Sequence, residues 1–215
     1  MKQRTYVYVD GFNLYYGCLR KSPYKWLDLK SLFSKLLNDS HEISKIKYFT
    51  ALISSREGNE NARLRQKIYL KALQQFTPEI EIHYGHYLTH EINVKLVNPK
   101  PGASPFAKAY KTEEKGSDVN LASHLINDSW HDRYDCAVLV SNDSDLAEPL
   151  KLVKAEHHRN IGVIFPSTDP TRKPSRQLCA LADFIKPIRQ GTLAHSQLPL
   201  QIPNGRIFKP IEWEK

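Results

Sequence analysis

The sequence contains few cysteines and no long apolar run. No window approaches the roughly 18 consecutive apolar residues that a membrane-spanning helix needs. The N-terminus runs into only a short apolar segment, too brief for the core of a signal peptide. Three cysteines, odd in number and far apart, predict neither a disulfide framework nor a zinc knuckle. We therefore expect a soluble cytoplasmic protein whose thiols are small buried side chains.

A second absence concerns cofactor binding. No G-x-G-x-x-G segment follows the first apolar run, which disfavours a dinucleotide-binding oxidoreductase. Positive charge, in contrast, is in excess: 31 basic residues against 23 acidic ones give a net charge of +8. Plain solubility would account for such a balance, but it also favours partners that carry phosphate. The length of 215 residues, 40% of them hydrophobic, suits one α/β domain.

Apolar runs typical of strands alternate with stretches of helical periodicity. Strands are predicted over 5–9, 43–53, 79–84, 137–140 and 160–165, with a short edge strand over 184–188. Helices are predicted over 28–37, 59–76, 117–126 and 175–182, and after the strand at 137–140, with Ser117 as one N-cap. This alternation predicts an α/β fold with a mostly parallel sheet of five to six strands, covered on both faces.

Four aspartates are expected to converge at one edge of that sheet. Asp10 follows the first strand, and Asp143 and Asp145 follow the strand that ends at Val140. In parallel sheets, functional groups gather beyond the carboxyl ends of the strands, where the strand order reverses. If these two strands are neighbours, their carboxylates meet, and Asp118 can join them from the start of the helix at 117–126.

Carboxylates grouped in this way repel one another unless a cation neutralises them. Oxygen ligands without histidine or cysteine favour Mg²⁺ or Mn²⁺ over zinc. Such an ion supports hydrolysis of a phosphodiester bond by an activated water. Asn13 and Ser141 are placed to orient that water or to cap a helix. The competing interpretation of each aspartate alone is a simple helix N-cap.

The segment 88–116 is rich in proline and lysine and predicts a basic, partly extended loop or hairpin. Exposed basic residues there and on the helix at 59–76 are candidate contacts for RNA phosphates, although a solvated surface is the simpler alternative. Aromatic neighbours are candidates for stacking on unpaired bases. With Ser141, the candidate RNA contacts are Arg63, Lys108, Lys111 and Lys115. We expect residues 1–190 to form one domain and 191–215 an extended C-terminal arm. The arm is expected to pack on the domain through Ile207, Phe208, Ile211 and Trp213.

Four motifs in order together resemble the NYN domain. They are the segments 8–14 (YVDGFNL), 115–119 (KGSDV), 140–150 (VSNDSDLAEPL) and 175–185 (SRQLCALADFI). The NYN domain is a branch of the PIN-like nucleases that includes bacterial proteins of the LabA and DUF88 type. The family commonly has glycine where this chain has Asn142.

The resemblance implies a PIN-like three-layer fold and a ribonuclease dependent on Mg²⁺ or Mn²⁺. It maps the metal-binding acids onto Asp10, Asp118, Asp143 and Asp145, with Asn13 as the polar residue after the first strand. The resulting hypothesis is an endoribonuclease that acts on single-stranded or loop RNA, as a monomer or a homodimer.

Two alternatives remain open at this point. One is a non-catalytic RNA-binding or regulatory module that keeps the fold. The other is a phosphatase of the haloacid-dehalogenase type, which also places acids at strand ends. That class needs a second aspartate two residues after its nucleophile, where this chain has Phe12.

Overall fold

The computed structural model describes residues 2–53, 60–102, 104–203 and 205–213. At its centre lies a six-stranded parallel sheet in the order β3-β2-β1-β6-β7-β8. Its strands are β1 (Gln3–Asp10), β2 (His41–Thr50), β3 (Ile80–Tyr84), β6 (Cys136–Val140), β7 (Asn160–Phe165) and β8 (Phe184–Pro187). The order turns at β1 and places β1 beside β6, which is the condition for their aspartates to meet. The expected α/β fold with a mostly parallel central sheet is confirmed.

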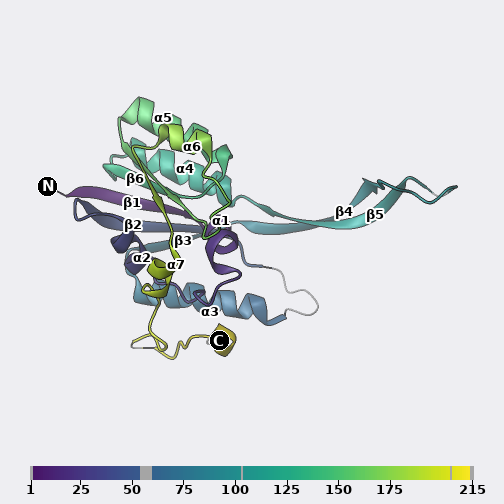
Figure 1. The fold of residues 1–215 in the computed structure, drawn as a ribbon, viewed down its shortest axis with the longest axis horizontal. Helices are drawn as coiled ribbons and strands as arrows, with labels where there is room; N and C mark the ends of the chain where they lie inside the picture. Colours follow the sequence, from purple (N-terminus) through teal and green to yellow (C-terminus); the bar gives the residue numbers. More distant parts are fainter. Residues whose placement is uncertain (1, 54–59, 103, 204, 214–215) are drawn as a thin grey trace.

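Helices cover both faces of the sheet (Figure 1). On one face lie α4 (Ser117–Trp130), α5 (Ala147–His157) and α6 (Arg176–Leu181). The other face carries α2 (Leu29–Leu36), α3 (Glu60–Phe76) and α7 (Gln190–Ala194). Short elements complete the chain: α1 (Gly11–Leu14), the π-helical turn η1 (Tyr15–Leu19), and the 3-10 turns η2 (Ser144–Leu146) and η3 (Ile211–Trp213). Asn59, the expected first residue of the helix at 59–76, lies outside the described residues.

The sheet separates two hydrophobic clusters, one under each helical layer. All five residues of β6 are buried, because a central parallel strand is covered on both faces and is therefore apolar throughout. Cys18 and Cys136 are buried free thiols, as expected, and Cys179 is half-buried. None of the helices in the described ranges is both long and apolar enough to cross a bilayer.

The basic segment after β3 forms an antiparallel hairpin of β4 (His86–Lys95) and β5 (Phe106–Lys115). This hairpin belongs to no other sheet and extends away from the body of the protein (Figure 1). Ten residues per strand correspond to a length of about 30 Å. The hairpin leaves the body beyond the carboxyl end of β3, the edge at which the aspartates were expected.

The C-terminal segment packs on the layer formed by α2 and α3. Leu193, Leu198 and Ile202 are buried there, and the Trp213 ring lies 6.3 Å from that of Trp26. Of the apolar residues expected to contact the domain, Ile207 and Trp213 pack against this cluster. Phe208 and Ile211 are instead exposed to solvent.

Candidate metal and RNA site

Asp10 is fixed at the end of β1 by the turn that follows it. Its side chain caps α1, with Oδ1 accepting a hydrogen bond of 2.9 Å from the backbone N–H of Asn13. The Asn13 amide Nδ2 donates to Oδ2 at 2.6 Å. The N-cap interpretation is therefore correct for Asp10, but it describes only part of the environment. Asp10 is 3% exposed, an unusual position for a carboxylate that only caps a helix.

Strand pairing brings Ser141 to Asp10. Val9 of β1 pairs with Val140 of β6, so the residues that follow each strand lie side by side. The Ser141 hydroxyl donates a hydrogen bond of 2.8 Å to Asp10 Oδ2 and accepts one of 3.0 Å from the backbone N–H of Asp143. Ser141 is completely buried, and its hydroxyl links Asp10 to the backbone of Asp143.

The pKa of Asp10 is set by opposing effects. Burial raises the pKa of this carboxyl above its ordinary value, and repulsion from Asp143 adds to that rise. Hydrogen bonds from Asn13 and Ser141 lower the same pKa, because they stabilise the ionised form. The net effect is a raised pKa, and the three donors hold the Asp10 carboxyl group in place beside a second aspartate.

Asn142 connects this centre to two further loops. Its backbone N–H donates to Asn13 Oδ1 at 3.3 Å, and its own Oδ1 accepts a 2.7 Å bond from the backbone N–H of Ser175. Ser175 is in turn the N-cap of α6. The asparagine at a common glycine position of the family therefore connects β1, β6 and α6, a connection that sequence reasoning missed.

Asp143 and Asp145 lie in the turn after β6. Asp143 caps η2, with Oδ1 accepting a 3.0 Å bond from the backbone N–H of Asp145. Asp143 is half-buried, whereas Asp145 is exposed and carries the acidic charge of the first turn. Both aspartates follow the carboxyl end of β6, as predicted.

Asp118 reaches the same edge from α4. Partial desolvation, together with repulsion from Asp10 and Asp143, raises the pKa of Asp118 to about 6. Weaker repulsion comes from Glu114 and Asp145. This mutual influence shows that the four predicted aspartates share one electrostatic environment.

The start of α4 differs from the expectation. Its N-cap is Gly116, in a left-handed conformation (φ 94°), and not Ser117. The carboxylate of Glu114 provides the missing side-chain cap by accepting hydrogen bonds from the backbone N–H and the hydroxyl of Ser117. The expectation was wrong because the left-handed turn moves Ser117 inside the helix, where its hydroxyl no longer reaches the exposed N–H groups. Glu114, three residues before Ser117, was the available signal.

The acids do not form a closed metal centre as they stand. Within the described ranges, no three aspartate, glutamate, histidine or cysteine side chains are arranged to hold a metal ion. The chemistry of the donors nonetheless fits a hard divalent cation, because they are carboxylates whose mutual repulsion raises the pKa of Asp118. Two of the four, Asp118 and Asp145, are exposed at the rim of the site.

Four of the five candidate RNA contacts lie on two elements, whereas the fifth, Ser141, is completely buried and hydrogen-bonded to Asp10. Lys108, Lys111 and Lys115 lie on β5 of the hairpin, and Arg63 is exposed near the start of α3. Each of the three lysines forms an ion pair with a glutamate of the hairpin, at 2.6 to 3.4 Å. These pairs join exposed side chains and contribute little to stability. Lys115 lies three residues before Asp118, so β5 leads directly into the acidic edge.

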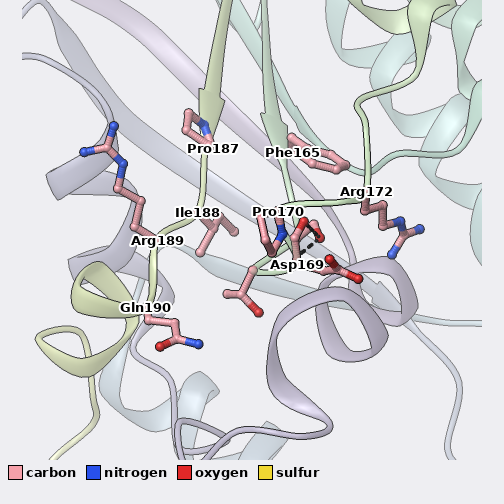
Figure 2. Close-up of a pocket in the computed structure, with 10 residues that line it drawn as sticks. Phe165, Asp169, Pro170, Arg172, Pro187, Ile188, Arg189 and Gln190 are labelled. Atoms are coloured by element: carbon pink, nitrogen blue, oxygen red, sulfur yellow. Dashed lines mark hydrogen bonds between the residues drawn. The ribbon is translucent and has the colours of Figure 1, made fainter.

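A pocket lies beside the acidic edge, at the carboxyl ends of β7 and β8 (Figure 2). It is an open hollow of about 340 Å³, and its walls include Phe165, Pro170 and Ile188. Arg172 and Arg189 stand at its margins, with their guanidinium groups turned outward (Figure 2). Sequence reasoning did not identify this pocket, because its residues come from separate loops without a shared motif.

Comparison with known proteins places the chain among relatives. The model of the NYN domain matches residues 4–189. 6-Hydroxy-3-succinoylpyridine 3-monooxygenase HspA of Pseudomonas putida is 38% identical, and the match covers 98% of this chain and 75% of that protein. A solved structure from Vibrio parahaemolyticus, described as a protein of unknown function, shares the fold with a TM-score of 0.57 at 17% identity. That match covers 88% of this chain and 94% of the Vibrio chain.

Proposed function

The chain belongs to the NYN domain family, and from this premise we propose that it is a metal-dependent ribonuclease. The observation that carries the proposal is the shared environment of Asp10, Asp143 and Asp118. Desolvation of Asp118 and repulsion from Asp10 and Asp143 raise the pKa of Asp118 to about 6. Carboxylates grouped at such an electrostatic cost are typical of functional sites, and a bound cation would neutralise their repulsion.

Asp10, Asp118, Asp143 and Asp145 would hold a Mg²⁺ or Mn²⁺ ion. When bound, the ion supplies Lewis-acid stabilisation of the phosphate and makes a water molecule more acidic. Asn13 and Ser141 orient the carboxyl group of Asp10 through their three hydrogen bonds to it. The hydrolysis forms a P–O bond to the water oxygen and breaks the P–O bond to the leaving nucleotide.

Cleavage of labelled RNA tests this proposal. Purified protein is incubated with structured and unstructured RNA in Mg²⁺, Mn²⁺ or EDTA, beside the variant Asp143→Asn. We expect Asp143→Asn to lower the rate by about 100-fold or more, the scale of a lost catalytic group. Asp39→Asn, an exposed aspartate in the turn before β2, is the matched control and should retain activity. Cleavage that survives both EDTA and Asp143→Asn would refute the proposal.

A second candidate function rests on the relative HspA, whose name describes a monooxygenase acting on a substituted pyridine. The match covers almost the whole chain, and the absence of G-x-G-x-x-G argues only against one way of binding a dinucleotide. In this case the open pocket beside Phe165 is the candidate place for a small aromatic substrate.

Oxygen consumption separates the two candidates. A monooxygenase places one atom of O₂ in the substrate and reduces the other to water, with two electrons from a donor such as a reduced nicotinamide. Incubation with 6-hydroxy-3-succinoylpyridine, the donor and air should then yield an oxygenated product detected by mass spectrometry. Asp143→Asn should leave that reaction intact if the pocket is its site, and no product forms if the protein is only a ribonuclease.

A further inference from the structure

We propose that the β4–β5 hairpin is an RNA-binding arm that holds a single strand and delivers it to the acidic edge. The inference rests on the proposed ribonuclease function and names how its substrate is held. It starts from the isolation of the hairpin, which extends from the body without packing into the main sheet (Figure 1). An isolated pair of strands is only marginally stable, and its exposed apolar side chains indicate a surface that binds a partner.

The outer half of the hairpin has a one-sided charge. Beyond the Glu91–Tyr110 pair, residues 92–109 contain three lysines, Lys95, Lys100 and Lys108, and no acidic residue. The acidic residues of the hairpin lie nearer its base, at Glu91, Glu113 and Glu114. The outer half is therefore suited to phosphate groups, and its attraction to them depends on salt.

Strand pairing sorts the hairpin side chains onto two faces. Opposed residues of an antiparallel pair share a face. Thr89 and Thr112 are such a pair, and their hydroxyls lie 2.9 Å apart on one face of the hairpin. The same face carries, two residues apart along β5, Phe106, Lys108 and Tyr110. Lys95 joins it opposite Phe106, and Glu91 lies on it opposite Tyr110. This lysine and aromatic face is a repeating platform of ring, charge and ring.

The rings of this platform are unusually open to solvent. Tyr110 is 81% exposed and Phe106 is 56% exposed. Aromatic side chains on a sheet surface stack on unpaired bases, while lysines between them contact the backbone. Lys108 currently pairs with Glu91 at 2.7 Å, but both side chains are exposed, so a phosphate can replace the glutamate at small cost.

The opposite face is a poorer docking surface. Its outer part consists of Ile92, Val94, Ala107 and Ala109, all half-buried against one another on the hairpin. Four small side chains provide far less than the roughly 800 Å² per partner that a stable protein interface buries. A second copy of the chain is therefore the weaker explanation, and RNA is the occupant that the charge and the rings favour.

The base of the hairpin is tied to the acidic edge. The backbone N–H of Gly85 donates to Thr50 O of β2 at 2.8 Å, which continues the sheet into the hairpin. Tyr87 packs edge-to-face on Phe12, two residues after Asp10, at 6.2 Å. A Cβ atom at Gly85 would lie 2.6 Å from Lys115 O, so the two strands approach too closely there for any other residue. A strand of RNA lying on the arm is therefore led toward Asp10 and Asp118.

Fluorescence anisotropy with a labelled oligouridylate in EDTA tests the arm without cleavage. Phe106→Ala and Tyr110→Ala should each weaken binding about tenfold, the effect of losing one stacked base. Lys108→Gln should reduce the slope of log affinity against log salt by about 0.7. Trp130→Ala, a 74% exposed ring at the far end of α4, and Lys151→Gln, a lysine also paired with a glutamate, are matched controls and should have no effect.

The outcomes separate the arm from the nuclease. Binding that depends on the arm in a protein that never cleaves RNA supports the arm and refutes the ribonuclease. Cleavage and binding unchanged in the hairpin variants refute the arm and leave the ribonuclease intact. Absence of RNA binding by the wild-type protein refutes the arm. Light scattering that shows a dimer which Tyr110→Ala converts to monomers also refutes it, because the rings would then belong to a second copy.

Discussion

The two ends of α4 treat their acidic residues in opposite ways. At its last turn Asp128 is fully buried, yet its carboxylate accepts hydrogen bonds from Lys47 (2.6 Å), Tyr8 (2.7 Å) and Arg133 (2.8 Å). Burial alone would raise the pKa of Asp128, but these partners lower it below its ordinary value. At the first turn, the pKa of Asp118 rises to about 6 through desolvation and neighbouring acids. One helix thus carries an aspartate whose charge is balanced by cationic side chains, Asp128, and one whose neighbours are acidic, Asp118.

The difference shows where the protein provides its own counter-charge. Around Asp128, cationic side chains from β2 and from the turn after α4 complete a structural cluster. Around Asp118 the near neighbours that shift its pKa are carboxylates. The first arrangement stabilises the fold, whereas the second costs stability until something positive arrives. The following four predictions test this contrast, from the largest effect to the smallest.

Removing the buried acid should be the most damaging change. Asp128→Ala removes the nearest carboxylate of the Lys47 ammonium, which is 5% exposed, and leaves it the more distant Glu81 at 3.7 Å. We expect a loss of about 3–5 kcal/mol of unfolding free energy. Urea denaturation measures it. The double variant Lys47→Met with Asp128→Leu removes both charges and should recover most of the loss. A cost below about 1 kcal/mol for Asp128→Ala would mean that water solvates the Lys47 ammonium in place of the Asp128 carboxylate.

His83 gives the same cluster a pH dependence. Desolvation and the nearby His124, whose ring lies 4.0 Å away, lower the pKa of His83 from 6.5 to about 4. Between pH 6.5 and 4, His83 is protonated in the unfolded chain but neutral in the folded one. The free energy of unfolding therefore falls as pH decreases from 6.5 to 4. We expect His83→Gln to remove about 2 kcal/mol of that fall. His90→Gln on the hairpin is the control, and identical pH profiles for wild type and His83→Gln would contradict the prediction.

A divalent cation should stabilise the uncompensated end. At ten times its dissociation constant, Mg²⁺ or Mn²⁺ should add about 1.4 kcal/mol to the unfolding free energy. Thermal unfolding with and without the ion measures this. Asp143→Asn should abolish the gain, while Asp39→Asn should keep it. An equal shift in all three proteins would locate the effect elsewhere.

Asp118 itself should be a small burden in the metal-free protein. The pKa of this acid is raised from 3.8 to about 6, so the folded state loses stability as pH rises through that window. We expect Asp118→Asn to stabilise the protein by about 1 kcal/mol at pH 7.5, a figure reduced for solvent screening of an exposed group, and by nothing at pH 3.5. Destabilisation at pH 7.5 would show that the carboxylate already has a positive partner.

Sequence reasoning located the strand ends because apolar runs closing on aspartate are local signals. It named the pairing of β1 with β6 as the condition for the aspartates to meet, since parallel α/β sheets have few strand orders, and the structure meets that condition. The buried cluster could not be read in the same way. Lys47 alternates with apolar residues in β2 as a solvent-facing residue would, and only its contact with Asp128, 81 positions later, buries it. The hairpin was anticipated as an extended basic segment, but its projection depends on how β3 continues past Gly85 into β4.

The two ends of the hairpin meet at one point, and this gives the arm a separable character. Gly85 and Gly116 lie back to back, since a Cβ atom built on Gly116 falls 3.9 Å from Gly85 Cα. The part of the hairpin from Leu88 to Glu113 can be shortened or exchanged without moving β3 or α4, because β3 is held by the main sheet and the start of α4 by Glu114, which lies outside that part. The arm is in this sense a replaceable attachment, through which the same acidic edge can be directed to a different target.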